Sequence, residues 1–336
     1  MTEPGTEPRR EGKRAKGRGK GQRGERLMVP RAEFRSYYGR PVLKAPVWKT
    51  PDVPGYLFFG GLAGASSVLA AFAQAAGNPQ LARNAKVAST AAIAISAVAL
   101  VNDLGRPARF LNMLRVFKTS SPMSVGSWLL AAYGPVSGAA AASAVTSRLP
   151  RAGAAATAGA AVLGSGIATY TAALICDTAV PAWHDGHREM PYLFAGSATS
   201  AAGGLGMLTA PSAQTGQAAR FAALGAATEL AAKHLMMHRL GDIAEPYHAG
   251  RPGRLLRAAE GLTVAGLAGS VVASSGRSRS VSQVASRAAG LALVAASALT
   301  RFGVFEAGLA SARDPGYTVR PQRERADQAR ATTLAV

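Results

Sequence analysis

Long apolar stretches alternate with short polar connections along most of the chain. A helix needs about 20 mostly apolar residues to cross ~30 Å of hydrocarbon. Eight stretches approach that length, and the connections between them carry Pro, Gly and charged residues, which end helices. The predicted fold is therefore an all-α integral membrane protein, a bundle of about eight transmembrane helices. The predicted spans are Val53–Ala76, Ala85–Val101, Met123–Val145, Ala152–Cys176, Pro191–Ala210, Ala218–His238, Ala258–Ser275 and Val284–Ala310.

The distribution of charge favours lipid over water as the surroundings of these helices. Only 17% of the residues are charged, whereas a soluble domain usually carries about 25%. A soluble helix keeps one polar face, and the stretches 85–101 and 152–176 show almost none. The mean hydropathy is only +0.10 because the polar tails lower it.

Composition divides the chain into three parts. Residues 1–46 form a basic tail that we expect to be largely disordered, residues 47–312 hold the membrane domain, and residues 313–336 form a polar C-terminal tail. The net charge of +20 suggests nucleic acid as a partner. However, the basic residues between Arg9 and Arg26 alternate with Gly and Glu and include no aromatic residue, which favours a topology signal or contact with a lipid surface. No apolar run follows this start for about fifty residues, which argues against a cleavable signal peptide.

The basic residues also predict the orientation. With an even number of spans, both termini lie on the same side, and the connections on the two sides carry nearly equal numbers of Lys and Arg. The densely basic N-terminal region gives the side of the termini the larger number of Lys and Arg, and that side is predicted to be cytoplasmic. We therefore expect a multi-pass protein of the plasma membrane with both termini in the cytoplasm.

Small residues are spaced for close helix packing. Gly60 and Gly64 are four residues apart, as are Gly134 and Gly138. This spacing puts each pair on one helix face, where a neighbouring backbone can approach closely. The spacing predicts tight helix packing and does not indicate a chemical role.

Ionisable side chains in or beside a span are candidates for function, because burial in lipid costs several kcal/mol. Asp103 and Arg106 follow the second span and can pair, although they also suit a helix end at the interface. In the sixth span, Glu229 and Lys233 are four residues apart and are predicted to pair on one helix face. With His234 beside them, we interpret this stripe as an ion pair together with a proton path or a polar cavity.

The chain lacks the ligands for common redox centres. Cys176 is the only cysteine, so a disulfide or a Cys-ligated cluster cannot form within the chain. Of the five His, three lie in connections and two share one helix, which does not suit axial ligation of haem by facing helices. We expect no haem, no iron–sulfur cluster and no metal site. Tyr170 lies inside the fourth span, where its hydroxyl needs either a ligand carbonyl or, more commonly, a helix backbone as its partner.

Two blocks of sequence resemble a known family. The stretches DLGRPARF at 103–110 and SPMSVGSW at 121–128 resemble the signature of the NrfD/PsrC-like membrane subunits of polysulfide and nitrite reductases. The resemblance extends over about Val47 to Gly316. Supporting agreement lies at 60–64, 170–171, 181–183, Arg301 and 306–315.

The resemblance implies a function. Members of that family are haem-free helical bundles that exchange electrons and protons with a quinone and dock an iron–sulfur subunit, which contacts a molybdopterin oxidoreductase. This chain would then be the membrane anchor of a formate dehydrogenase-like or polysulfide reductase-like complex. Its bound substrate would be menaquinone or ubiquinone, and its partners a 4Fe-4S ferredoxin-like subunit and the molybdopterin catalytic subunit. Because the substrate chemistry lies on that other subunit, this chain would be non-catalytic or supply only the quinone site.

The resemblance and the polar residues together predict three sets of site residues. Tyr56 stands where some relatives have a histidine. The quinone-binding set is Asp52, Tyr56, Tyr170, Asp103 and Arg106. The proton route is Asp103, Glu229, Lys233 and His234, and the partner-docking set is Arg109, Trp183 and His184.

Two other functions compete with this one. The same polar stripe suits a secondary transporter or a proton-translocating bundle without a redox role. Transporters often contain internal repeats with broken helices, and the two halves of this chain show no convincing repeat. A purely structural anchor is the third possibility, and the polar positions at 52–56 and 170 argue against it.

Overall fold

The computed structural model describes residues 42–44, 46–106, 108–274, 279–320 and 322–323, without the side chains of 272–274 and 279–281. The predicted basic tail lies almost entirely outside the described residues. Within them the chain is built of helices and contains no strand. Eight described helices have 20 or more residues. They are α1 (Asp52–Ala75), α2 (Pro79–Leu104), α4 (Pro122–Thr146), α5 (Pro150–Cys176), α7 (Met190–Thr209), α8 (Thr215–Leu240), α10 (Gly250–Ser274) and α11 (Arg279–Arg313).

Short elements connect the long helices. They are α3 (Ala108–Met113), α6 (Pro181–Asp185), α9 (Glu245–His248) and the 3-10 turns η1 (Ser212–Gln214) and η2 (Gly241–Ala244). Proline occupies the first helical position of α2, α4 and α5. It suits that position because its missing N–H would have no partner there and its fixed φ fits the helix.

Each long helix contains most of one predicted stretch, but α2, α10 and α11 begin at least five residues earlier than predicted, at Pro79, Gly250 and Arg279. Five of the described helices are long and apolar enough to cross a membrane: α1, α2, α4, α5 and the Ser282–Arg313 part of α11. The other three are less apolar, because α7 is rich in Gly, Ser and Thr while α8 and α10 carry charged residues. The number of eight membrane spans therefore remains a prediction.

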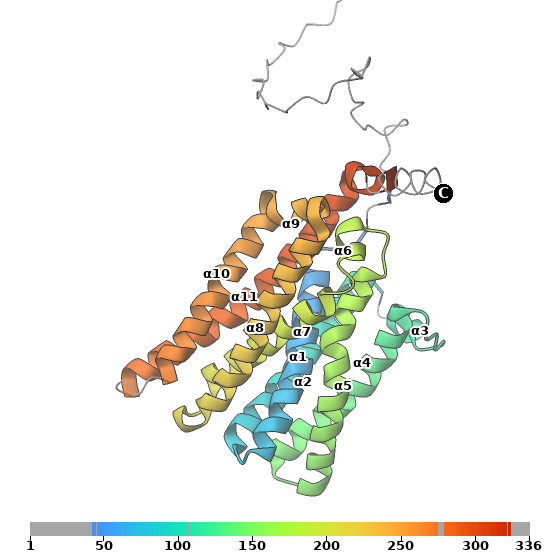
Figure 1. The fold of residues 1–336 in the computed structure, drawn as a ribbon. Helices are drawn as coiled ribbons and strands as arrows, with labels where there is room; N and C mark the ends of the chain where they lie inside the picture. The colour runs from blue at the N-terminus through green and yellow to red at the C-terminus, as the bar shows by residue number, and fades with distance from the viewer. Residues whose placement is uncertain (1–41, 45, 107, 275–278, 321, 324–336) are drawn as a thin grey trace, which may run out of the picture. The chain divides into compact units, whose positions relative to one another are not determined.

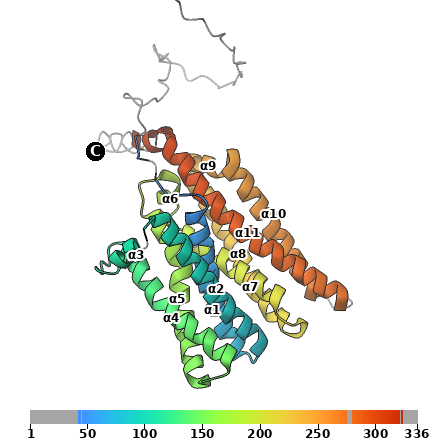
Figure 2. The ribbon, with the colours of Figure 1, turned by 180° about the vertical axis from the view of Figure 1, so that it is seen from behind.

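The long helices form two groups of four (Figures 1 and 2). In the first bundle α1 packs against α2 and α5, and α4 packs against α2 and α5. In the second bundle α7 packs against α8 and α11, and α10 packs against α8 and α11. Contacts of α1 with α7 and α11, and of α5 with α7, join the two bundles.

Glycines allow the closest helix approaches. A Cβ added to Gly64 on α1 would overlap the backbone of Gly164 on α5, so these helices touch backbone to backbone. Gly60 also faces α2 and α5, where a Cβ would meet side-chain atoms only, the nearest being Ser96 Oγ at 3.2 Å. For Gly134 and Gly138 the predicted packing role is wrong, because a Cβ there would meet nothing within 4 Å. That face of α4 is turned away from the neighbouring described helices.

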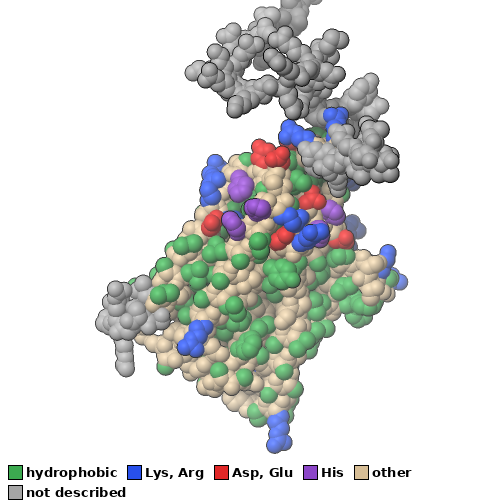
Figure 3. Space-filling view, in the orientation of Figure 1, with side chains coloured by type: hydrophobic (Ala, Val, Ile, Leu, Met, Phe, Trp, Pro, Cys, Tyr) green, Lys and Arg blue, Asp and Glu red, His purple; other side chains and the backbone are tan. Residues whose placement is uncertain are grey.

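Among the described residues, the acidic and histidine side chains lie mostly towards one end of the helices, whereas Lys and Arg occur at both ends. Figure 3 shows Asp, Glu, Arg and His side chains concentrated where α6 and α9 lie in Figure 1, above a largely apolar face. We call this the α6–α9 end. Helices α1, α4, α7 and α10 begin there, and the helices between them return to it.

Candidate functional site

A cavity of about 110 Å³ lies within the first bundle, near the α6–α9 end. It is bounded by the start of α1, the end of α2, the start of α4 and the end of α5. For scale, an engineered apolar cavity of about 150 Å³ holds benzene, so this space suits the edge of a small ring. Most of the wall is apolar. The residues that give it polar character or shape are Trp48, Tyr56, Asp103, Gly126, Ser127 and Tyr170.

Two tyrosines face each other across this cavity. Tyr56 on α1 is buried and Tyr170 on α5 is half-buried, and their hydroxyl groups lie close enough to interact. The two residues are 114 positions apart in the chain. The structure therefore brings together two members of the predicted quinone-binding set.

Gly126 on α4 provides the space in which the Tyr170 ring lies. A Cβ added at this position would overlap the ring and its hydroxyl oxygen. Next to it, Ser127 donates its hydroxyl to the Met123 carbonyl at 2.8 Å. The sequence block at 121–128 therefore shapes one wall of the cavity.

A segment before α1 closes the cavity on the side of the α6–α9 end. We call residues 46–51 the strap. The Lys49 backbone N–H donates to Asp103 Oδ1 at 3.1 Å, and the Trp48 ring stacks on Trp183 with centroids 5.6 Å apart. Asp103 thus bonds to the strap, and the predicted Asp103–Arg106 ion pair does not form among the described residues. Asp52 and Arg106 belong to the predicted set but do not line the cavity.

The prediction that Trp183 docks a partner is wrong. Its side chain is 0% exposed, and its indole N–H donates to the Val304 carbonyl at 2.8 Å. The ring packs on Gly308, where a Cβ would overlap it. A tryptophan in a polar connection suggests a surface position, but α6 folds this one inward. Arg109 and His184, the other two residues of the docking set, are exposed.

The prediction that Glu229 pairs with Lys233 is also wrong. Lys233 pairs instead with Glu260 on α10, with Nζ and Oε2 2.7 Å apart, and His234 is exposed. Glu229 is only 3% exposed and accepts the Thr300 hydroxyl at 2.7 Å. The reason is geometric: α8 turns Glu229 towards α11, whereas the long stem of Lys233 carries its ammonium outward.

Arg301 on α11 completes a buried centre and was not among the predicted site residues. Its side chain is 0% exposed, its Nη2 donates to the Phe194 carbonyl at 2.6 Å, and its guanidinium carbon lies 3.8 Å from the Phe194 ring centroid. We call Phe194, Glu229, Thr300 and Arg301 the buried-charge centre. Within the described residues, Arg301 Nε and Nη1 and Glu229 Oε2 have no hydrogen-bond partner. A lone Arg inside an apolar run was the available signal, but the Phe194 carbonyl to which it donates lies on another helix.

The described residues contain no group of three or more His, Cys, Asp or Glu side chains arranged to hold a metal ion.

The chain matches the family described as "Polysulphide reductase, NrfD" over residues 42–244. This match spans more than half of the 336 residues, including the whole cavity and Glu229. The chain belongs to the NrfD family. It is therefore a multi-pass membrane protein of a family whose members are membrane subunits of oxidoreductase complexes and partner with iron–sulfur and molybdopterin subunits. A search of curated proteins gives no match.

Proposed function

We propose that this NrfD-family protein exchanges electrons and protons between a partner iron–sulfur subunit and a membrane quinone. The observation that carries the proposal is the cavity that brings Tyr56, Tyr170 and Asp103 together on an otherwise apolar wall. These three residues come from α1, α5 and α2. In this proposal the chain is the haem-free anchor of a molybdopterin complex of the formate dehydrogenase-like or polysulfide reductase-like kind.

The chemistry of the wall fits a quinone. A quinone ring is flat and largely apolar, and its carbonyl oxygens accept hydrogen bonds. Phenol hydroxyls donate such bonds, so Tyr56 and Tyr170 would hold and orient the ring. When bound, menaquinone or ubiquinone supplies two-electron, two-proton redox chemistry that the chain itself lacks. Asp103 at the cavity edge would accept or deliver a proton, while the strap beside it limits access of water.

The buried-charge centre extends the proposed proton route. Arg301 reaches α1, because a Cβ on Gly61 would lie 3.2 Å from its Nη2. Gly61 is five residues after Tyr56 on the same helix, so the centre and the cavity are neighbours along α1. Lys233 and His234, by contrast, point away from it. We therefore assign the inner part of the route to Glu229, and keep Lys233 and His234 only for its outer end.

The α6–α9 end is the proposed docking surface for the iron–sulfur subunit. Arg109 and His184 are exposed near the connections that surround this end, and the cavity lies just beneath it. A partner there would bring its cluster close to Tyr56 and Tyr170. With cytoplasmic termini, this end of the protein would face the cytoplasm across the plasma membrane.

Tyr170→Phe in the assembled complex tests the site. The change removes one hydroxyl and keeps the ring on Gly126. We expect quinone-linked turnover to fall about tenfold. One hydrogen bond to the reacting quinone contributes about 1.4 kcal/mol, and losing that amount lowers the rate by this factor. Electron transfer from the catalytic subunit to a soluble dye should not change. Tyr192→Phe is the matched control, because Tyr192 on α7 is 65% exposed and lies outside the cavity.

Two results would count against the proposal. Equal quinone-linked turnover in the Tyr170→Phe and wild-type complexes would remove Tyr170 from the site. Purification of the chain from membranes without any iron–sulfur or molybdopterin subunit would contradict its role as an anchor, whatever the behaviour of Tyr170.

A further inference from the structure

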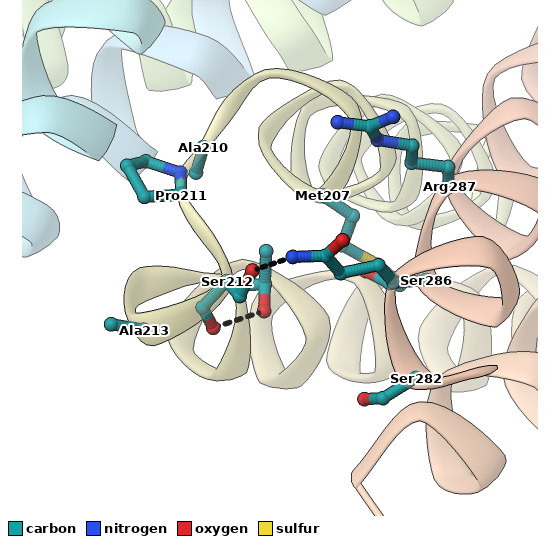
Figure 4. Close-up of a pocket in the computed structure, with 10 residues that line it drawn as sticks. Met207, Ala210, Pro211, Ser212, Ala213, Ser282, Ser286 and Arg287 are labelled. Carbon is teal, nitrogen blue, oxygen red and sulfur yellow. Dashed lines mark hydrogen bonds between the residues drawn. The ribbon is translucent and has the colours of Figure 1, made fainter. Parts of the chain in front are cut away.

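A second, larger cavity lies at the other end of the helices from α6 and α9. Its volume is about 720 Å³, and it is enclosed by the end of α7, the start of α8 with η1, and the start of α11. Figure 4 shows its lining, which mixes hydroxyl and amide groups with apolar residues. Among the described residues, the lining contains no Asp or Glu, and Arg287 is its one ionisable side chain.

Two adjacent residues of α11, Ser286 and Arg287, bring hydrogen-bond donors to this cavity. Ser286 is 5% exposed, and its hydroxyl has no hydrogen-bond partner among the described residues. Arg287 is exposed, and in Figure 4 its guanidinium reaches from α11 towards the opposite helices. A buried hydroxyl without a partner is costly, so a ligand acceptor at this position would be stabilising.

The third contribution comes from a helix start. The helical run of η1 and α8 begins at Ser212, and no side chain caps either element. Gln283 from α11 donates to Ser212 Oγ at 2.6 Å, which fixes this start against α11 (Figure 4). The first N–H groups of a helix carry partial positive charge and bind anions.

We propose that this cavity binds the phosphate of an anionic phospholipid. Arg287 would pair with the phosphate, and Ser286 and the start of the helical run would donate to its oxygens. The apolar part of the site favours a lipid headgroup over a free anion as the source of the phosphate. Met207 and Pro211 line one side, and Val284 on α11 is 70% exposed beside it, where an acyl chain would pack. This site is independent of the proposed quinone function and lies at the opposite end of the helices.

Native mass spectrometry of the full-length protein in phosphatidylcholine-containing micelles tests the site. Palmitoyl-oleoyl-phosphatidylglycerol is added to wild type, Arg287→Gln, Ser286→Ala and Arg220→Gln. Arg220 is a matched control, because it is an exposed arginine near the start of α8 that does not line the cavity. We expect wild type to retain the anionic lipid in preference to phosphatidylcholine. Retention should weaken about tenfold in Arg287→Gln, less in Ser286→Ala, and not in Arg220→Gln.

Competition with inorganic phosphate separates the two sources of the anion. If millimolar phosphate leaves the bound phosphatidylglycerol in place, the lipid assignment is supported. If phosphate alone displaces the lipid in wild type but binds more weakly to Arg287→Gln, the site is a free-anion site and the lipid assignment is overturned. Equal retention by Arg287→Gln and Arg220→Gln would overturn the site altogether.

Discussion

The two bundles of this protein bury different kinds of polar groups. In the first bundle, a buried network of neutral hydroxyls joins α1, α2 and α4, and the ammonium of Lys86 donates to Gln74 Oε1 at 2.6 Å. Tyr133 donates to the Ala63 carbonyl at 2.7 Å, and its oxygen also lies 2.7 Å from the hydroxyls of Ser67 and Ser89. In the second bundle the interior holds two ionisable groups, Glu229 and Arg301, with atoms that lack partners among the described residues.

The difference indicates separate roles. A satisfied hydroxyl network fixes helices to one another and has no charge to change. Buried ionisable groups are expensive in lipid and mark functional positions. The first bundle therefore holds a static wall around the cavity, and the second holds the charge that we assign to proton movement. The helix α1 contacts both bundles and connects these roles.

The largest expected effect comes from removing one buried charge. Glu229→Leu removes the buried carboxylate that accepts from Thr300 and leaves Arg301 as the charged member of the buried-charge centre, so it should lower the free energy of unfolding by about 3–5 kcal/mol. Arg301→Met should cost less, because a carboxyl group can take up a proton whereas a guanidinium keeps its charge. Thermal unfolding of the purified proteins in one detergent measures both changes.

The neutral network supplies the control for this experiment. Tyr133→Phe removes one hydroxyl and should cost about 1 kcal/mol or less, as interhelical hydrogen bonds in membranes do. The double variant of Glu229→Leu with Arg301→Met should recover part of the loss, because neither charge is then left alone. A cost for Glu229→Leu no greater than that for Tyr133→Phe would contradict the distinction between the bundles.

The next effect tests the wall of the cavity. Gly126→Ala puts a methyl group where the Tyr170 ring lies, so we expect the ring to move and quinone-linked turnover to fall more than tenfold. The overpacking should also cost about 1–3 kcal/mol of stability. Gly134→Ala is a matched change on the same helix, where a Cβ meets nothing within 4 Å. It should leave turnover unchanged. Loss of turnover in both variants would show that α4 responds to any added methyl group.

The helices of both bundles could be predicted from the sequence alone. Apolar length, together with prolines such as Pro79, Pro122 and Pro150 at helix starts, is local information. The cavity could be predicted in part, because the block at 121–128 resembles a family signature and Tyr170 lies deep in an apolar run. Spacing along the chain does not predict which neighbour a side chain faces, because that depends on how the helix is rotated in the bundle. It gave Gly134 and Gly138 the same packing role as Gly60 and Gly64, although the α4 pair faces no neighbour.

The buried-charge centre could not be predicted from spacing for the same reason. Glu229 has Lys233 four residues away on its own helix, but the packing of α8 and α11 brings its carboxylate to the hydroxyl of Thr300, far along the chain. Trp183 was assigned to the predicted partner-docking set, which requires a surface position. The start of α6 and the Gly308 face of α11 instead bury its ring.

The smallest expected effect comes from an ion pair of the same residue types outside the spans. Glu189, just before α7, accepts from Arg239 Nε and Nη2 at 2.7 and 2.6 Å. Hydrogen bonding from Arg239 holds the pKa of the Glu189 carboxyl below its ordinary value. A depressed pKa contributes stability above the ordinary Glu range, and that contribution is lost as the pH falls through the lowered pKa. Because the pair is partly exposed, its contribution should be at most about 1 kcal/mol.

Arg239→Gln should therefore lower stability slightly at neutral pH and make no difference in acid. Unfolding of wild type and Arg239→Gln, measured from about pH 7 down to about pH 3, should converge as Glu189 becomes protonated. Arg254→Gln, which removes an exposed arginine of α10, is the control and should follow wild type throughout. The expected cost is small because water already screens the attraction in a solvent-exposed pair. A cost for Arg239→Gln as large as that for Glu229→Leu would mean that burial is not what makes the charge of Glu229 important to stability.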